Sequence, residues 1–319
     1  MKIAVDVMGS DRGPGEVIAG AWKWAEETGN QVFLVGNADV VEKEMQLIGS
    51  KSDLVSCVGA SEVITMDESP AYALRKKKDA SIVIATGLVK QGLADAVLSC
   101  GSTGAQMAAA IFILGRMEGV ERSPIVTPLP GAKDLATLLV DVGANVDCRP
   151  KQLLQFAVLG KTYATIVTGN PEPRIALLNN GEEEGKGNSV SVETYELLKK
   201  QSNLKFIGNI EGRDLLLGKA DVVVCDGFVG NVVIKTLEGA AMFIAREVVK
   251  EFGRLPAVFE KLDYTKVGGA PLLGVNGISI VCHGSSNRDA VYYGMKAAYE
   301  CGQKDIIGMQ REAIEQTRE

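Results

Sequence analysis

Six segments of the sequence share a design that suits anion binding. In each, an apolar run that predicts a buried strand passes into a turn rich in Gly, Asn, Asp or Ser. The clearest is DVVVCDGFVGNVVIKTLEG, residues 221–239, where we expect a strand at 222–224 and a helix after Asn231 as its N-cap. The others are IAVDVMGSD (3–11), AVLSCGSTG (96–104), LLVDVGANVD (138–147), IALLNNGEEEGKGN (175–188) and ISIVCHGSSN (278–287). Turn N–H groups and helix N-termini attract phosphate, so these segments predict a polar, phosphate-binding crevice.

Two side chains in these turns could do chemistry with a bound phosphate. Lys186 lies between Gly185 and Gly187, and His283 is the only histidine in the chain. The alternative interpretations are an exposed loop lysine and a capping or packing histidine. As catalytic groups, Lys186 would contact phosphate, and His283 would orient phosphate or act as an acid or base.

The remaining candidates are small or hydrogen-bonding residues of the same turns. We expect phosphate or substrate contacts from Asp6, Gly9, Ser102, Thr103, Asn145, Gly181, Asn188, Asp226, Gly230, Asn231 and Ser285. The strand-end aspartates, Asp141 included, have a structural alternative, because each could accept hydrogen bonds from the following turn.

Three cysteines also precede these turns: Cys100, Cys225 and Cys282. They raise the alternative of a Cys–His pair that forms a covalent acyl-enzyme. Small thiols buried beside packed strands are the favoured interpretation. None of the six cysteines forms a C-x-x-C pair, so we expect reduced thiols.

We expect no metal and no cofactor. The carboxylates of Glu182, Glu183 and Glu184 are consecutive, and consecutive side chains do not converge on one ion, so we interpret them as solvated charge. The turns GSTG and DGFVG are G-x-x-G patterns that lack the acidic ribose partner of a dinucleotide site. A nicotinamide-dependent dehydrogenase is therefore a weak alternative.

The elements that must position these turns alternate between strand and helix. This order predicts an α/β fold with a mostly parallel sheet, whose ligands bind at the carboxyl ends of the strands. Prolines bracket residues 125–129, which predicts an edge strand. We expect a single domain over 1–319, with a subdomain boundary near TGNPEP at 168–173 if there are two.

Composition limits the function classes. The 319 residues carry a net charge of −6, which argues against a nucleic-acid partner. Met1-Lys2 leads directly into a predicted strand, so we expect no signal peptide and a cytoplasmic protein. We also expect no apolar run of transmembrane length.

Two surface features suggest partners. The run Arg75-Lys76-Lys77-Lys78 is either a solvated helix face or a docking patch for an acidic protein. The predicted helix at 232–252 and the amphipathic segment 256–262 have apolar faces with basic residues nearby, namely Arg246, Lys250, Arg254 and Lys261. These faces would lie against an anionic membrane surface or pack in a dimer.

The motifs NNGEEEGKGN, DGFVGNVVIKTLEG, GGAPLLGVNG and HGSSN resemble those of the PlsX family of acyl-acyl-carrier-protein:phosphate acyltransferases. The resemblance extends over essentially the whole chain and includes IAVDVMG, GSTGA, DVGANVD and FIGNIEGRDLL. It implies transfer of a long-chain fatty acyl group from acyl carrier protein to inorganic phosphate. The product, an acyl phosphate, would feed phospholipid synthesis through a glycerol-3-phosphate acyltransferase. It also implies a homodimer with an α/β/α fold related to phosphate acetyltransferase and isopropylmalate dehydrogenase.

The chain departs from the family pattern at three places. Ser10-Asp11-Arg12 replaces a second Gly and a frequent His, Ser102 replaces the usual Asn, and the stretch 238–268 is shorter than in some relatives that contact membrane. The last departure puts membrane attachment in question more than chemistry. An acyl-CoA:phosphate acyltransferase and a non-catalytic acyl-carrier or lipid-binding scaffold remain alternatives.

Overall fold

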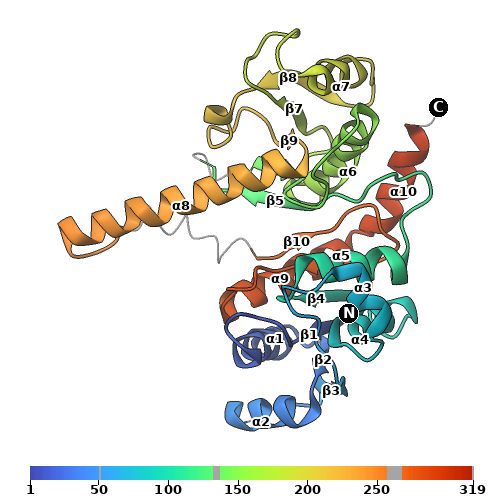
Figure 1. Cartoon of the computed structure of the whole chain (residues 1–319), viewed down its shortest axis with the longest axis vertical. Helices are drawn as coiled ribbons and strands as arrows, with labels where there is room; N and C mark the ends of the chain where they lie inside the picture. The colour runs from blue at the N-terminus through green and yellow to red at the C-terminus, as the bar shows by residue number, and fades with distance from the viewer. Residues whose placement is uncertain (50–51, 132–136, 257–267, 318–319) are drawn as a thin grey trace. The chain divides into compact units, whose positions relative to one another are not determined.

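The computed structural model describes residues 1–49, 52–131, 137–256 and 268–317, and the chain folds into two compact units (Figure 1). Unit 1 comprises Met1–Glu118 and Thr265–Arg311, and unit 2 comprises Gly119–Tyr264 and Glu312–Glu319. The segment 168–173, where the sequence suggested a boundary, lies inside unit 2. The predicted amphipathic segment 256–262 lies outside the described residues from position 257 onward.

Unit 1 is built on a six-stranded sheet that is parallel except at one edge. Its strands are β1 (Lys2–Asp6), β2 (Gln31–Gly36), β3 (Val55–Gly59), β4 (Ala96–Ser99), β10 (Ala270–Pro271) and β11 (Ile278–Val281). Their order is β10-β11-β4-β1-β2-β3, and only β10 runs antiparallel to its neighbour. The central strands are apolar and buried on both faces, as helices on both sides of a parallel sheet require.

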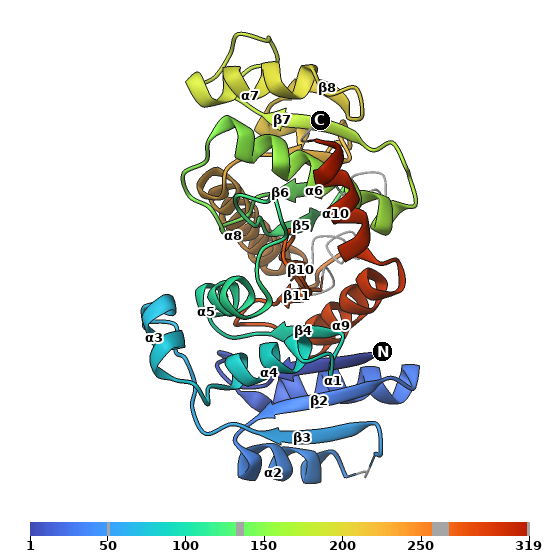
Figure 2. The same ribbon diagram turned by 90° about the vertical axis from the view of Figure 1, so that its right-hand side faces the viewer.

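Helices cover both faces of this sheet (Figure 2). They are α1 (Pro14–Thr28), α2 (Ala38–Ile48), α3 (Pro70–Lys76), α4 (Ser81–Lys90), α5 (Thr103–Ala109) with its π-helical continuation η1 (Ala110–Leu114), and α9 (Arg288–Gln303). α10 (Ile306–Gln316) begins in unit 1 and ends in unit 2. α1 packs on α9, where Gly20 allows the close approach, since a Cβ there would overlap the backbone of Arg288. On the other face, α4 and α5 pack their alanines and Ile82 against Ala4 and Val97.

Unit 2 contains a second sheet, of five strands. They are β5 (Val126–Leu129), β6 (Thr137–Val140), β7 (Arg174–Leu178), β8 (Lys205–Ile210) and β9 (Val222–Val224), in the order β5-β6-β9-β7-β8. β5 is the antiparallel edge strand that its flanking prolines predict. The helices are α6 (Pro150–Thr168), α7 (Ser189–Lys199), the 3₁₀ turn η2 (Gly212–Asp214) and α8 (Gly227–Phe252).

The two faces of the second sheet are covered by different helices. On one face Gly160 of α6 lies directly over Val140 and Val222. On the other, Leu139 and Val223 belong to a cluster that the first turns of α8 help to close with Val233, Ile234 and Leu237. The helix that follows β9, α8, therefore covers one face of the sheet, and the helix that follows β6, α6, covers the other.

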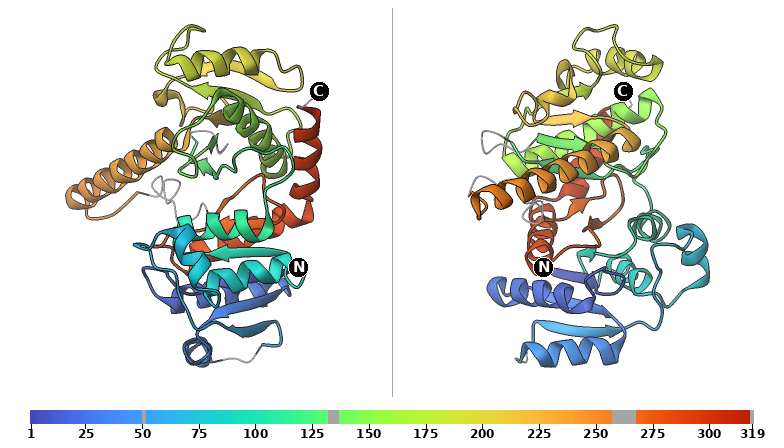
Figure 3. Two further views of the ribbon diagram at one scale, coloured as in Figure 1. Left: turned by 45° about the vertical axis from the view of Figure 1, so that its right-hand side comes forward. Right: turned by 60° about the vertical axis from the view of Figure 1, so that its left-hand side comes forward.

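α8 begins earlier than we expected, ends at Phe252 as predicted, and extends away from the rest of its unit (Figures 1 and 3). Its N-cap is Asp226, whose carboxylate accepts from Val229 N–H at 2.8 Å, so the prediction of Asn231 as N-cap is wrong. Only Gly227 and Gly230 of its 26 residues are buried. The helix is long and apolar enough to span a membrane by length and composition, which corrects the expectation that no such segment exists. Scattered polar residues such as Lys235 and Glu238 interrupt the apolar run in the sequence.

Candidate active site

The strand order of unit 1 reverses between β1 and β4. From β1 the chain continues outward to β2 and β3, while β4 and then β11 lie on the opposite side of β1. In open α/β sheets ligands bind at such a reversal, beyond the carboxyl ends of the strands. Four of the expected contact residues of unit 1 end or directly follow these strands: Asp6, Gly9, Ser102 and His283. They therefore lie at the carboxyl ends of the strands.

Asp6 is the last residue of β1, beside the reversal in strand order, and is 3% exposed. Its carboxylate accepts from Ser99 Oγ at 2.8 Å and from the N–H of Met8 at 3.1 Å. Ser99 Oγ in turn accepts from Gly101 N–H at 3.0 Å. Burial raises the pKa of Asp6 from 3.8 to about 6, although bonds from Ser81, Ser99 and Met8 oppose the shift. The carboxylate thus orients the turns after β1 and β4.

These two turns touch at glycines. A Cβ on Gly9, whose φ is +81°, would lie 3.3 Å from the Cα of Gly101. Ser102 is the N-cap of α5, with its hydroxyl accepting from Ala105 N–H at 3.3 Å. Thr103 follows as an exposed residue of the first helical turn. The Ser102 hydroxyl is therefore used within the protein, and a substrate contact from this turn would fall to backbone N–H groups at the start of α5.

His283 stands in the turn between β11 and α9. Its Nδ1 lies 2.7 Å from Ser285 Oγ and accepts from Ser285 N–H at 3.1 Å. The loop after β1 holds this turn, because Ser10 Oγ donates to the Gly284 carbonyl and Arg12 Nε to the Ser285 carbonyl. His283 itself is exposed. The histidine is therefore an ordered surface group at the carboxyl end of β11, not a packed core residue.

In unit 2 the turn after β6 is organised by a buried carboxylate, Asp141. It accepts from the backbone N–H groups of Ile125, Ala144 and Asn145 at 2.7 to 3.1 Å, and from Asn145 Nδ2 at 2.9 Å. Burial still raises the pKa of Asp141 above its usual value. The structural alternative for this aspartate is confirmed, because its oxygens bind the turn.

The first turn of α8 is seated against this turn. Gly227 N–H donates to the Asn145 carbonyl at 2.7 Å, and a Cβ on Gly230 would overlap the carbonyl oxygen of Asp141. Asn231 lies within van der Waals distance of a Cβ built on Gly143. Asn145, Gly230 and Asn231 are therefore brought together where β9 leads to α8.

The loop after β7 carries Lys186. Asn179 Nδ2 donates to the Lys186 carbonyl at 2.9 Å, and Gly181 lies under the lysine stem, where a Cβ would be 2.9 Å from Cγ. Asn188 caps α7, accepting from Ser191 N–H at 2.9 Å. Within the described residues, the exposed Lys186 ammonium has no hydrogen-bond or ion-pair partner. The loop thus fixes the backbone of Lys186 and leaves its charge available.

Acidic groups near these loops have other partners. Carboxylate oxygens of Glu182, Glu211 and Asp214 lie within 4.8 Å of one another. Lys219 Nζ pairs with Glu182 at 3.1 Å and with Asp214 at 2.8 Å. Glu184 pairs with Lys199 at 2.9 Å. Lys219 thus already pairs with two of the three carboxylates of this cluster.

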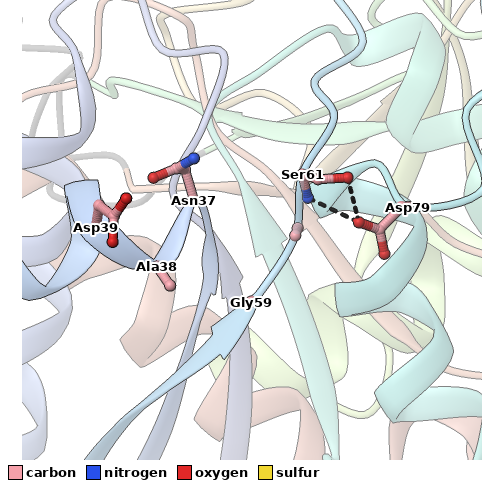
Figure 4. Close-up of a pocket in the computed structure, with 7 residues that line it drawn as sticks. Asn37, Ala38, Asp39, Gly59, Ser61 and Asp79 are labelled. Carbon is pink, nitrogen blue, oxygen red and sulfur yellow. Dashed lines mark hydrogen bonds between the residues drawn. The ribbon is translucent and has the colours of Figure 1, made fainter.

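A hollow of about 290 Å³ lies at the ends of β2 and β3 in unit 1 (Figure 4). Asn37 and Asp39 line one side, and Ser61 and Asp79 the other. Asp79 accepts from both the hydroxyl and the N–H of Ser61. Two carboxylates in a hollow disfavour phosphate, and the lining contains none of the residues that we expect to contact substrate.

The cysteines are all unpaired thiols. A hydrogen bond with Cys282 and burial raise the pKa of Cys100 well above 9, and burial does the same for Cys225. A thiol with a raised pKa is a poor nucleophile at neutral pH. These environments favour the packing interpretation of Cys100 and Cys225 over an acyl-enzyme.

The basic run ends α3 and does not act as a unit. Lys77 Nζ pairs with Glu68 at 2.7 Å and donates to the Val63 carbonyl at the same distance. Arg75 and Lys76 are exposed, and Lys76 Nζ lies 5.4 Å from the ring centre of Tyr72. Lys77 is therefore used within the unit, whereas Arg75 and Lys76 present charge to solvent.

Two positioning residues were missed by the sequence analysis. Ser99 links Asp6 to Gly101, and Asn179 holds the Lys186 loop. Each is the polar residue at the end of, or just after, a run of apolar strand residues. A polar residue at that place is the signal that could have identified them.

Comparison with known proteins shows the family. The model of the family described as fatty acid synthesis protein matches residues 1–309. A phosphate acyltransferase of Syntrophomonas wolfei is 61% identical over 312 residues, covering 98% of each chain. A phosphate acyltransferase of Desulforamulus reducens is 49% identical over 329 residues, covering 99% of this chain and 98% of that one.

Solved structures share the fold at low sequence identity. A phosphotransacetylase from Streptococcus pyogenes has a TM-score of 0.65 at 20% identity, covering 94% of each chain. A branched-chain phosphotransacylase from Enterococcus faecalis has a TM-score of 0.62 at 17% identity, covering 95% of this chain and 99% of that one. The predicted α/β fold related to phosphate acetyltransferase is confirmed. The chain therefore belongs to the PlsX family, described as fatty acid synthesis protein, and is an enzyme of the phosphate acyltransferase class.

Proposed function

We propose that the acyl donor is a long-chain acyl carrier protein thioester and that the acyl phosphate product feeds phospholipid synthesis. Inorganic phosphate is the acceptor. A glycerol-3-phosphate acyltransferase would consume the product, since an acyl phosphate is an activated acyl donor. The alternative donor is acyl-CoA, which has the same thioester chemistry on a different carrier.

One observation carries the mechanism: in each unit the expected contact residues gather at carboxyl ends of parallel strands. In unit 1 these are the turns around Asp6 and His283, and in unit 2 the turns around Asn145 and Lys186. Both sets combine backbone N–H donors with fixed side chains, and unit 2 adds a cation. Such donors bind a dianion and stabilise an oxyanion without rearranging.

The reaction needs no protein nucleophile. An oxygen of HPO₄²⁻ attacks the thioester carbonyl carbon and forms a tetrahedral oxyanion. The C–S bond then breaks, the carrier leaves as thiolate, and that sulfur takes the proton of the phosphate. Lys186 would neutralise charge on the phosphate, and N–H groups of the turns would bind the oxyanion. The raised pKa values of Cys100 and Cys225 support this direct route over a covalent one.

We propose that the carrier protein docks on α3. Acyl carrier protein is acidic, and this chain has a net charge of −6, so attraction needs a local basic patch. Arg75 and Lys76 offer exposed charge beside Tyr72, whose side chain is 62% exposed. Lys77, the third residue we expected to dock, is paired with Glu68 and would support the helix instead.

We place the protein in the cytoplasm as a homodimer with a peripheral membrane contact. The support is α8, where Met242, Phe243 and Phe252 are 58, 67 and 65% exposed. Exposed apolar side chains on a helix favour a covering surface, either a second copy or an anionic membrane. Arg246 and Lys250 on the same helix would favour anionic lipid.

A donor comparison tests the proposal. The purified protein is incubated with phosphate and either long-chain acyl carrier protein or acyl-CoA, and acyl phosphate is followed by ³¹P NMR. We expect product from the carrier-protein thioester at a much higher kcat/KM, and none without enzyme. Lys186→Ala should lower kcat by about 10²–10⁴ with the fold intact, the range for losing a positioned catalytic group. Lys200→Ala, in an exposed helix end, is the matched control. Preference for acyl-CoA would contradict the proposed donor.

A further inference from the structure

The turn that carries His283 is held in place by the loop after β1. Ser10 Oγ and Asp11 N–H both donate to the Gly284 carbonyl oxygen, at 3.0 and 2.9 Å. Arg12 Nε donates to the next carbonyl oxygen, that of Ser285, at 2.6 Å. Three donors from one loop therefore fix two successive peptide groups of the turn.

The peptide group between Gly284 and Ser285 is bound at both of its ends. Its carbonyl accepts from Ser10 and Asp11, and its N–H donates to His283 Nδ1 at 3.1 Å. A backbone N–H can only donate, so Nδ1 has to offer its lone pair. The Ser285 hydroxyl, 2.7 Å from the same nitrogen, can rotate to donate as well. A proton on Nδ1 would instead face another N–H.

We propose that His283 is held as the tautomer protonated on Nε2, that it acts on substrate as a hydrogen-bond donor and not as a base, and that Ser10 is a positioning residue behind it. The inference rests on the proposed function only for the group that accepts this hydrogen bond, an oxygen of phosphate or of the thioester. A neutral ring that accepts at Nδ1 meets a substrate oxygen with Nε2–H. Phosphate is already charged at neutral pH, so a donor serves the reaction better than a base.

Ser10 is suited to this role because its hydroxyl bonds in two directions. It accepts from Arg12 N–H at 3.3 Å while donating to the Gly284 carbonyl. Its O–H, the peptide group and the imidazole form one chain of hydrogen bonds, in which each bond polarises the next. Gly284 permits the close approach, since a Cβ there would lie 2.5 Å from the Asp11 carboxylate.

The single histidine makes the tautomer directly measurable. Protein labelled with ¹⁵N-histidine gives one imidazole in a long-range ¹H–¹⁵N spectrum, so every signal belongs to His283. A protonated and an unprotonated ring nitrogen have widely different ¹⁵N shifts. In the neutral ring, we expect Nε2 to be protonated and Nδ1 unprotonated. A spectrum dominated by the Nδ1–H form would overturn the proposal, whether or not the enzyme turns over the proposed donor.

Variants test the positioning role. Ser10→Ala should lower the share of the Nε2–H form and reduce kcat about tenfold, with KM for phosphate little changed. This loss is smaller than the roughly 10²–10⁴ expected when a positioned acid or base is itself removed, because Ser10 acts only through the turn. Ser10→Thr, which keeps a hydroxyl, should restore both, and Ser56→Ala on the exposed side of β3 is the control. Should Ser10→Ala fail to fold, Arg12→Met removes the other side-chain bond to the turn and should shift the tautomer in the same direction. An unchanged tautomer share in the folded variants would refute the role of Ser10.

Discussion

The buried carboxylate of Asp6 holds the turns after β1 and β4, and its burial lowers the stability of the fold at neutral pH. The carboxylate is buried among strand ends, where it orients the Ser99 hydroxyl and the Met8 N–H. Its pKa is about 6 in the fold, against 3.8 for an unperturbed group, and burial is the main cause. The folded state therefore binds a proton more tightly than the unfolded state. The stability linked to that proton is fully present below pH 3.8 and is lost as the pH rises through about 6.

Asp6→Asn should accordingly stabilise the protein in a pH-dependent way. A shift of about two pKa units corresponds to roughly 3 kcal/mol at pH 7 to 8, because one unit is about 1.36 kcal/mol. We expect the variant to gain up to this amount at pH 8, to gain little at pH 4, and to lose activity as the turns lose their charged acceptor. Denaturant unfolding at the two pH values measures the difference. A stability difference that is equal at both values would contradict this interpretation of Asp6.

Single residues also show where prediction from the sequence stops. Ser102, Asn188 and Asp226 were expected to contact substrate, and each of their side chains accepts from the backbone of the helix it begins. N-caps and anion sites use the same residue types at the same place, so the sequence does not separate them. Their contact with substrate remains a prediction. We expect the backbone N–H groups at these helix N-termini to make it, and not the capping side chains.

At the level of elements, the strands and most helices follow from hydrophobic patterning, but the start of α8 does not. Gly227 and Gly230 looked like turn residues, and the helix was expected only after Asn231. In the fold both glycines are helical, and they allow the helix to lie directly on the turn of Asp141 and Asn145. The sequence alone does not distinguish a glycine that permits close packing inside a helix from a glycine that permits a turn.

Gly230→Ala tests this seating of α8. Its methyl group would overlap the Asp141 carbonyl, so we expect a loss of about 2–3 kcal/mol in unfolding free energy, as for overpacking. Gly239→Ala, on the same helix with nothing within 4 Å of the added Cβ, should be neutral or stabilise by up to about 1 kcal/mol. Equal effects of the two substitutions would show that Gly230 is not a packing contact.

α3 carries the prediction about the carrier. Arg75→Glu with Lys76→Glu should raise KM for acyl carrier protein at least several-fold, most strongly at low salt, and leave KM for phosphate unchanged. Lys77→Glu should mainly lower stability, because that ammonium holds Glu68 and the Val63 carbonyl. Steady-state kinetics at two salt concentrations decide the matter. Wild-type KM in the double variant would remove α3 as the docking site.

At the scale of the whole molecule, the prediction concerns the surface that covers the exposed apolar side chains of α8. Replacing Met242 and Phe243 by Ser should weaken dimerisation, co-flotation with anionic vesicles, or both, since both proposed surfaces use the apolar face. Leu47→Ser, on the 72% exposed side chain of α2, is the control. Light scattering and flotation at low salt separate the two partners. A monomer that does not float, with or without the substitutions, would contradict both roles.

The division into two units was the part of the architecture least visible in the sequence. The composition break at TGNPEP, residues 168–173, lies inside unit 2, whereas the chain passes between units after Glu118 and again near residue 264. The chain passes between the units a third time after Arg311, and unit 1 is completed by a segment from the other end of the chain. Local hydrophobic patterning does not show that the chain returns to unit 1, because this return depends on long-range strand pairing such as that of β11 with β4.

The central claim is that phosphate attacks the thioester directly, and one measurement tests it most closely. The enzyme is mixed with stoichiometric long-chain acyl carrier protein in the absence of phosphate, quenched in acid, and examined by intact-protein mass spectrometry. A second sample receives phosphate before the quench. We predict unmodified enzyme in both samples, with the carrier discharged, and acyl phosphate formed in equal amount, only when phosphate is present. A stoichiometric acyl adduct on Cys225 or Cys282 that disappears on adding phosphate would contradict the account.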